Sequence, residues 1–495
     1  MFYKSTRSND AAVATAAQVI KQGLASDGGL FVPDEIPSLS QDEIAALCKE
    51  SYPVRAAKIL SKFLSDYTYE ELLNDCRAAY DESSFVGGAA PMVNIHDNLE
   101  SLELWHGPTA AFKDMALQIM PRLLSRALVK TGEERTALIL VATSGDTGKA
   151  ALEGYKDVDR VKIMVFYPVD GVSRVQKLQM ATQTGSNVNV CAIRGNFDDA
   201  QSGVKVIFGD QKMAKTLDAK GYFFSSANSI NWGRLAPQIV YYVSAYCDLL
   251  NAGKCKMGES FNVCVPTGNF GNIFAAYLAK LMGLPIGHMV CASNTNNILT
   301  DFLATGTYDR NREFYLTMSP SMDILISSNL ERLLYFTAGS EKTADYMKQL
   351  SANGVYHVDA DVFAKISENF VGYFADEKIT ANTIYNCWEK YGYLADTHTA
   401  VAISAAEQYI KESGDMLPMV IDSTASPYKF ANNVYRAVTK NEPESDLAAL
   451  DALAEATNTA IPYPLCGLAQ RKVRFDKVVA KEEMAAAVLE YLGIE

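Results

Sequence analysis

The stretch His106-Gly-Pro-Thr-Ala-Ala-Phe-Lys-Asp-Met-Ala-Leu-Gln118 decides how this chain is interpreted. Gly107 and Pro108 mark a turn, and an apolar, helix-favouring run follows Lys113 directly. The stretch therefore predicts a lysine at or near the start of a helix, flanked by Phe112. Burial and the positive end of a helix both disfavour the ammonium form, so such a lysine can lose its proton. A neutral amine can form a Schiff base with an aldehyde, although most lysines at helix starts are merely solvated.

Two further segments place a polar, glycine-containing turn between a short apolar strand and a helix. The run Thr136–Ala142 leads into the turn Thr143–Gly148, and Phe261–Val265 leads into the turn Pro266–Asn272. This layout presents backbone N–H groups to an anion at a helix N-terminus. Neither turn matches a common nucleotide signature, because no G-x-G-x-x-G occurs and the glycines of the first turn are too close for a P-loop. An ordinary strand-to-helix turn stays open for each.

Length and composition exclude several classes of protein. A chain of 495 residues exceeds the size at which one core keeps growing, so two or more domains are expected. The net charge of −13 argues against nucleic acid as a partner. The amino terminus has no apolar signal core, and no stretch approaches the ~18 apolar residues of a membrane span. We therefore expect a cytoplasmic protein without a membrane partner.

Cysteine and histidine usage predicts neither disulfides nor a metal site. The nine cysteines are odd in number and contain no C-x-x-C pair, and the five histidines show no ligand spacing. Several cysteines, such as Cys264 and Cys291, lie in apolar runs, where free cysteine behaves as a small hydrophobe.

The hydrophobic pattern predicts an α/β protein in three parts. Residues 1–95 form a mainly helical N-terminal domain, residues 96–225 a small α/β domain that carries Lys113, and residues 226–495 a large α/β domain with a C-terminal extension. Alternation of strands and helices predicts parallel sheets. The expected strands are Ala137–Val141, Val161–Phe166, Val188–Ala192, Phe261–Val265, His288–Ala292 and Leu417–Asp422, and the expected helices are Gln41–Ser51, Val54–Ser65, Tyr69–Tyr80, Ala200–Gly209 and Ala360–Ala375.

Together, the lysine segment and the two turns resemble the threonine synthases, which are pyridoxal-phosphate (PLP) enzymes of the tryptophan-synthase-β-like fold. The resemblance runs from residue 3 to about residue 430, with its motifs in the family's order. It also includes Tyr3–Arg7, Gly23–Pro33, Asn228–Gln238 and Ser423–Phe430. The resemblance implies PLP fold type II, with open, parallel-rich sheets flanked by helices behind a mainly helical N-terminal segment. It also implies PLP as the cofactor.

The resemblance assigns the cofactor contacts residue by residue. Lys113 binds PLP as a Schiff base and becomes the base once the substrate displaces it. Asp146 lies near the 3′-oxygen of the cofactor, at a position where related enzymes often carry asparagine. Thr424 faces the pyridine nitrogen, and the cofactor phosphate binds the loop of Gly268, Asn269, Phe270, Gly271 and Asn272.

Asp422 competes with Thr424 for the pyridine nitrogen, because the two residues share one face of the same strand. The other interpretation of Asp422 is a carboxylate that faces a loop. A hydroxyl such as that of Thr424 lacks the negative charge that would keep the nitrogen protonated. The family usually has histidine where this chain has Ser426, so a role of that histidine does not carry over.

Two polar sets are assigned to the substrate. The turn residues Thr143, Ser144 and Thr147 suit an α-carboxylate. A second set suits a phosphate group, because it combines a fork-shaped donor with neutral donors: Asn228, Ser229, Asn231 and Arg234. Pairing with an acidic neighbour is the alternative for Arg234.

Two further residues keep two interpretations each. His106 either lies near the cofactor or is a packed structural histidine. Lys149 either adds positive charge at the carboxylate turn or is a solvated lysine at a helix start.

The resemblance implies the conversion of O-phospho-L-homoserine and water to L-threonine and phosphate, the last step of threonine biosynthesis. Elimination at the γ-carbon would precede addition of water at the β-carbon. The alternatives are a threonine-synthase-like phospho-lyase that releases a 2-keto acid, a dehydratase or cysteine-synthase-type enzyme, and a non-catalytic protein that binds a sugar phosphate or a nucleotide. The expected partner is a small-molecule substrate, and the expected assembly is a monomer or homodimer.

Overall fold

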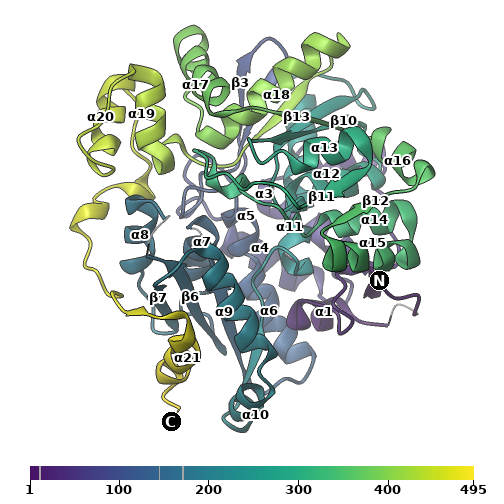
Figure 1. The fold of residues 1–495 in the computed structure, drawn as a ribbon. Helices are drawn as coiled ribbons and strands as arrows, with labels where there is room; N and C mark the ends of the chain where they lie inside the picture. Colours follow the sequence, from purple (N-terminus) through teal and green to yellow (C-terminus); the bar gives the residue numbers. More distant parts are fainter. Residues whose placement is uncertain (11–12, 144, 170–171, 495) are drawn as a thin grey trace.

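The computed structural model describes residues 1–10, 13–143, 145–169 and 172–494, and two parallel-rich sheets in separate lobes organise them (Figure 1). The larger sheet has six strands, and all run parallel except β3, which pairs antiparallel with β4. Across the sheet the strands are β13 (Phe370–Phe374), β10 (Ile286–Ser293), β9 (Phe261–Pro266), β14 (Met419–Ser423), β4 (Leu99–Glu103) and β3 (Met92–His96).

The smaller sheet has five strands, all parallel. In spatial order they are β15 (Val478–Val479), β7 (Val188–Ile193), β6 (Val161–Pro168), β5 (Thr136–Ala142) and β8 (Tyr222–Ser225). Strands β5 and β6 are almost wholly buried, as expected for a parallel sheet covered on both faces. The edge strand β15 comes from the end of the chain, which descends from the upper lobe and adds α21 (Met484–Leu492) beside this sheet (Figure 1).

Two short antiparallel pairs complete the strands, β1 (Tyr3–Ser5) with β2 (Phe31–Pro33) and β11 (Thr307–Asp309) with β12 (Val355–His357). The remaining α-helices are α1 (Ala16–Gln22), α2 (Gln41–Leu47), α3 (Tyr52–Phe63), α4 (Tyr69–Ala79), α5 (Asp114–Leu117), α6 (Met120–Lys130), α7 (Asp146–Tyr155), α8 (Arg174–Ala181), α9 (Phe197–Gly209), α10 (Gln211–Ala219), α11 (Trp232–Asn251), α12 (Gly271–Leu281), α13 (Ile298–Thr305), α14 (Leu330–Ala338), α15 (Ser340–Asn353), α16 (Ala360–Ser367), α17 (Glu377–Tyr391), α18 (Thr397–Ser413), α19 (Ala431–Thr439) and α20 (Ala448–Thr457).

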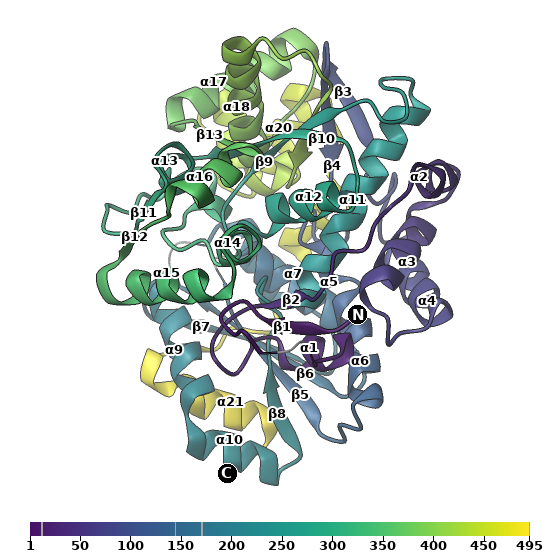
Figure 2. The same ribbon diagram turned by 90° about the vertical axis from the view of Figure 1, so that its right-hand side faces the viewer.

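Helix α11 forms the buried centre of the molecule. Every residue from Trp232 to Cys247 is buried, and a helix that is apolar nearly all round is expected to pack on every side. It contacts the N-terminal helix α3, the short helix α5 after Lys113, and α12, which follows the glycine turn Pro266–Asn272 (Figure 2). Helix α11 therefore packs against both the helix that follows the predicted lysine and the helix that follows the predicted phosphate loop.

Most of the predicted elements are confirmed, with differences of a few residues at their ends. The prediction of one helix over Ala360–Ala375 is wrong. Helix α16 ends at Ser367, and Phe370–Phe374 pairs with β10 as the edge strand β13. The β-favouring side chains of that segment and its pairing with β10 override the helical spacing. The domain boundaries stay a prediction; within the described residues, β4 belongs to the six-stranded sheet and β15 to the five-stranded one.

In the part of the chain that the structure describes, no helix combines the length and apolar character needed to cross a membrane.

Candidate active site

Lys113 lies directly before α5, on a segment tied to the end of β14. The N–H of Phe112 donates to the Thr424 carbonyl at 2.8 Å, and the N–H of Ser426 donates to the Ala110 carbonyl at 3.0 Å. A single antiparallel bridge, Ala111 to Ala425, results. The lysine therefore has a fixed position beside the residues predicted to face the cofactor ring.

The Lys113 amine is buried among charges of both signs, and its side chain is 12% exposed. Its Nζ lies 3.9 Å from Asp146 Oδ2 and donates to Ser321 Oγ at 3.4 Å. Burial lowers the pKa of Lys113 to about 8, although the carboxylate of Asp146 opposes this shift. The cations of Lys429 and Arg234 lower it further, and Asp114 raises it. A substantial share of the amine is therefore neutral at moderately alkaline pH, as its setting in the sequence suggests.

Asp146 begins α7 and carries the negative charge nearest to the lysine. Its Oδ1 accepts from Lys429 Nζ at 2.7 Å and from Gln176 Nε2 at 2.8 Å. Burial alone would raise the pKa of this carboxyl, but Lys429 and Lys113 hold it well below its usual range. Asp146 is therefore an ionised carboxylate between two lysines.

Lys429 is a site residue that sequence reasoning missed. It lies in the 3₁₀ helix η2 (Pro427–Phe430), is buried, and also donates to the Thr109 carbonyl at 3.0 Å. The signal available in the sequence was a lysine among apolar residues inside the Ser423–Phe430 motif.

The side chain of Thr143, the first residue of the turn predicted to hold the substrate carboxylate, holds that turn together by hydrogen bonds. Thr143 Oγ1 accepts from the N–H of Gly145 at 3.0 Å and of Gly148 at 2.9 Å. Gly145 has φ of 142°, and a Cβ there would lie 2.4 Å from the Gln176 side chain, so only glycine fits. Thr147 is half-buried in the first turn of α7. Ser144 lies outside the described residues.

The second turn forms a cradle of unpaired donors. Among the described residues, the main-chain N–H groups from Gly268 to Asn272 donate to no protein acceptor. The left-handed conformation of Phe270, with φ of 60°, turns successive N–H groups toward one side before α12 begins. The carbonyls point elsewhere, since Ser327 Oγ donates to the Gly268 carbonyl at 2.7 Å and Asn329 Nδ2 to that of Asn269 at 2.9 Å. This geometry suits a phosphate group.

A close approach of two backbones fixes one wall of this cradle. A Cβ on Gly268 would lie 2.8 Å from the Ser321 carbonyl oxygen, so the position requires glycine.

Asp422 links the six-stranded sheet to the cradle. It is fully buried, and its Oδ2 lies 2.6 Å from the Tyr242 hydroxyl, which lies equally close to Asn272 Oδ1. Burial raises the pKa of Asp422 to about 7. The interpretation of Asp422 as a loop-facing carboxylate is therefore wrong. The Thr424 hydroxyl, by contrast, has no hydrogen-bond partner in the described parts of the chain.

Arg234 is a buried guanidinium without a counterion, since no carboxylate of the described residues lies within 4.0 Å of it. Its Nη1 donates to the Ala227 carbonyl, and its Nε is buried without a partner. Burial lowers the pKa of Arg234 to about 10. The structure thus gives no support to pairing with an acidic neighbour. An unpaired buried charge is costly unless an anion binds there.

The three companions of Arg234 differ in what they can offer a ligand. Asn231 is committed to the fold, because its amide donates to the carbonyls of Ile20 at 2.9 Å and Ser226 at 3.1 Å while its oxygen caps α11. We therefore leave Asn231 out of the phosphate site. Ser229 is half-buried, and Asn228 is exposed.

The structure distinguishes between the two interpretations left open for His106 and for Lys149. The ring nitrogens of His106 lie 2.7 Å from Glu103 Oε2 and 2.9 Å from the Val86 carbonyl, which fits a packed structural histidine. Lys149 is buried and pairs with Glu153 at 2.8 Å. The interpretation of Lys149 as a solvated lysine is therefore wrong.

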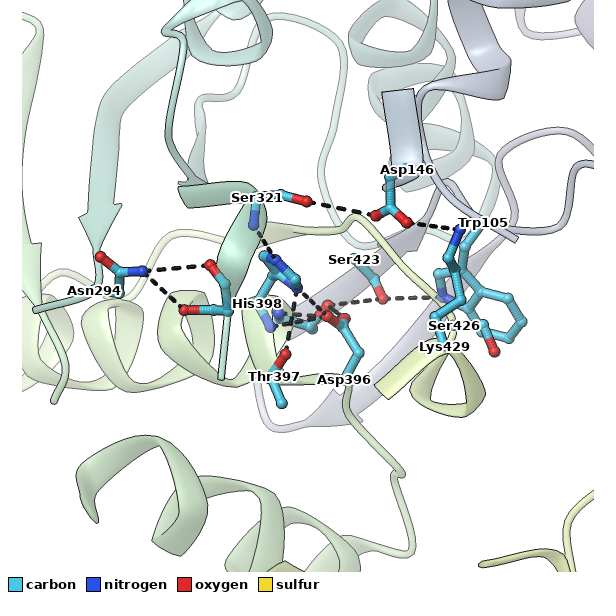
Figure 3. A network of polar contacts seen from close by, with 12 residues as sticks. Trp105, Asp146, Asn294, Ser321, Asp396, Thr397, His398, Ser423, Ser426 and Lys429 are labelled. Carbon is cyan, nitrogen blue, oxygen red and sulfur yellow. Dashed lines mark hydrogen bonds and ion pairs between the residues drawn. The ribbon is translucent and has the colours of Figure 1, made fainter. Parts of the chain in front are cut away.

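Ser321 and His398 also escaped sequence reasoning. Ser321 lies in the 3₁₀ helix η1 (Pro320–Met322), inside a stretch without any periodic pattern. Its N–H donates to His398 Nε2 at 3.1 Å, and His398 Nδ1 lies 2.9 Å from Asp396 Oδ1 (Figure 3). The signal available was an aspartate two residues before a histidine at a helix start.

The groups gathered here fit PLP. A buried amine of lowered pKa suits its aldehyde, the donor cradle at residues 268–272 suits its phosphate, and the unpartnered hydroxyl of Thr424 suits its ring nitrogen.

The lowered pKa of Lys113 predicts how cofactor capture depends on pH. Because only the neutral amine attacks an aldehyde, capture of PLP by the cofactor-free protein should accelerate about tenfold per pH unit below pH 8 and level off above it. Stopped-flow absorbance after mixing with PLP measures the rate constant. Nα-acetyl-lysine is the control, since its rate should still rise above pH 9. A rate for the protein that also rises above pH 9 would contradict the prediction.

Comparison with known proteins gives three family matches along the chain. Residues 2–80 match the family described as "Threonine synthase N terminus", residues 102–420 match "Pyridoxal-phosphate dependent enzyme", and residues 399–489 match "Threonine synthase, C-terminal".

Individual relatives agree with these matches. The human protein named threonine synthase-like 1 is 39% identical over 86% of this chain, which spans only 58% of that longer relative. The threonine synthase of Pseudomonas aeruginosa is 38% identical, over 88% of this chain and 90% of the relative. The PLP-bound threonine synthase structure from Brucella melitensis superposes with a TM-score of 0.88 at 37% identity, covering 99% of both chains. The fold class predicted from the sequence is thus confirmed, and the chain belongs to the threonine synthase family of PLP-dependent enzymes.

Proposed function

We propose that this protein converts O-phospho-L-homoserine and water to L-threonine and phosphate, as a carbon–oxygen lyase that acts on a phosphate ester. Two groups of donors without a protein partner among the described residues support the proposal. The donor cradle at residues 268–272 suits one phosphate, and the unpaired guanidinium of Arg234 suits a second. A PLP enzyme with a phosphorylated substrate needs both.

The residues around Lys113 divide the work of the reaction. PLP, when bound, serves as the electron sink for the carbanion at the substrate α-carbon. Once freed by the substrate, the Lys113 amine removes the α-proton, and a pKa of about 8 suits a base that works near neutral pH. Asp146 stays ionised beside Lys113 and limits how far its pKa falls.

The substrate is proposed to bind at both ends. The turn that contains Thr143, Ser144 and Thr147 would hold the α-carboxylate at the start of α7. Arg234, with Ser229 and Asn228 beside it, would hold the substrate phosphate and stabilise it as it leaves.

The burial of Arg234 without a counterion among the described residues is the observation that best supports a phosphorylated substrate. A dehydratase or cysteine-synthase-type enzyme has no second phosphate to bind, and a buried guanidinium without a counterion would only destabilise it. A substrate with a leaving phosphate gives this group a partner.

Simultaneous measurement of two products tests the proposal. Purified protein with PLP and O-phospho-L-homoserine should release phosphate and L-threonine in equal amounts. Phosphate with α-ketobutyrate and little threonine would instead identify a phospho-lyase. No phosphate release from protein that captures PLP would refute both activities.

We further propose a monomeric or homodimeric enzyme in the cytoplasm, with the small-molecule substrate as its partner and without nucleic acid. The net charge of −13 argues against nucleic acid, and all nine cysteines are free in the described structure, as is typical of a reducing compartment.

A further inference from the structure

Ser321 touches three parts of the candidate site at once. Its Oγ lies 3.4 Å from Lys113 Nζ and 3.4 Å from Asp146 Oδ2. Its carbonyl oxygen packs against Gly268, where no Cβ would fit. The Lys113 amine donates to the hydroxyl, which in turn donates to Asp146. Such an arrangement orients the amine.

His398 holds Ser321 through its backbone. The imidazole is 2% exposed, and its Nε2 accepts the Ser321 N–H. Because a main-chain N–H can only donate, this nitrogen carries no proton, so Nδ1 carries it and donates to Asp396 Oδ1. Asp396 is itself fixed as the cap of α18, where it accepts the N–H of His398 at 2.8 Å. The neutral tautomer is thus set by two rigid partners.

The other side of the same turn is also anchored. Asn294 Nδ2, just beyond β10, lies 3.0 Å from Ser319 Oγ and 2.8 Å from Asp323 Oδ1. The 3₁₀ helix η1 is therefore held between the end of β10 and the start of α18. Ser321 lies in the middle of this anchored helix.

We infer that the Ser321 hydroxyl orients the amine of Lys113, and that His398, backed by Asp396, is the positioning residue that keeps Ser321 in place. The inference rests on Lys113 as the cofactor lysine, but not on threonine as the product. Besides Asp396, the His398 ring faces Phe430, whose centroid is 4.8 Å away. The groups that face Lys113 are Ser321 and those that shift its pKa, namely Asp146, Lys429, Arg234 and Asp114.

PLP capture by the cofactor-free full chain tests this inference. Ser321→Ala removes the hydroxyl, and His398→Phe removes the acceptor but keeps a ring beside Phe430. In each variant the plateau rate above pH 9 should fall about 3- to 10-fold, the worth of one hydrogen bond. The pH midpoint should also move down, since an acceptor for the ammonium is lost. The double variant should behave like either single one, because both changes break one contact chain.

Rescue and control variants separate positioning from general damage. His398→Gln restores an acceptor and should return the midpoint to the wild-type pH, whereas His288→Leu changes an exposed histidine that bonds Tyr409 and should have no effect. If His398→Phe does not fold, as judged by circular dichroism, His398→Met replaces it.

Three results would overturn the inference. The first is a wild-type dependence of the capture rate on pH in His398→Phe, and the second is a dependence in His398→Gln like that of Ser321→Ala. The third is a double variant in which the two losses of rate multiply. Capture without threonine formation would refute the proposed function and leave this inference standing.

Discussion

Lys113→Arg is expected to lose phosphate release and threonine formation together, by about 10³-fold or more. Arginine keeps the positive charge beside Asp146 but offers no amine that can attack an aldehyde or take a proton from the substrate. Both products should be followed in the same reaction, with PLP present at saturation. Equal loss of both places the lysine before the step at which the phosphate leaves.

Lys113→Ala is the companion variant. It removes the charge as well, so the Asp146 carboxylate keeps Lys429 as its one close cation among the described residues. Added methylamine should restore part of the activity of Lys113→Ala by supplying a small amine in the vacated space, and should do nothing for Lys113→Arg. Threonine formation by Lys113→Arg at more than a tenth of the wild-type rate would contradict the role of Lys113 in this site.

Arg234→Met is expected to lower kcat/KM for O-phospho-L-homoserine by about 10²-fold, which corresponds to two hydrogen bonds to a charged phosphate. The KM should rise because the ground state loses its anchor, and the kcat should fall because the leaving phosphate loses its stabilising donor. PLP capture at pH 9, above the Lys113 pKa of about 8, should stay at the wild-type rate. This control separates the substrate phosphate from the cofactor phosphate.

Stability provides an independent check on the same variant. Because Arg234 is buried and has no counterion among the described residues, Arg234→Met should leave the free energy of unfolding unchanged or raise it by about 1 kcal/mol. Urea unfolding of the cofactor-free protein measures it. Full activity of Arg234→Met would show that Arg234 does not bind the substrate phosphate. Strong destabilisation of Arg234→Met would show that Arg234 has a structural role.

Sequence reasoning was strong where a signal is local. Lys113 before a helix and the Gly268–Asn272 turn between a strand and a helix are each encoded within about 20 consecutive residues, and both lie where the sequence predicts. The α/β fold class with parallel-rich sheets followed from the alternation of strands and helices for the same reason.

What sequence reasoning missed is non-local. Ser321 lies 208 residues after Lys113 in the sequence. Lys429 pairs with Asp146, although the two residues are also far apart in the sequence. Ser321 lies in a stretch without a periodic pattern, and although Lys429 lies inside the Ser423–Phe430 motif, nothing in that motif shows that it pairs with Asp146 before the fold is known. The strand β13 was missed for a related reason, since its pairing with β10 depends on chain distant in sequence.

The path of the chain through the two sheets has a consequence for biosynthesis. Strand β14 lies between β9 and β4 in the interior of the larger sheet, although it is the last of the six strands to be made. The smaller sheet likewise receives β15 only at Val478–Val479. Neither lobe can therefore be completed while the ribosome is still adding its closing strand, and the two lobes cannot mature one after the other in the order of synthesis. The larger sheet can therefore be completed only after Met419–Ser423 has been made, and pairing of strands so distant in sequence is expected to be slow.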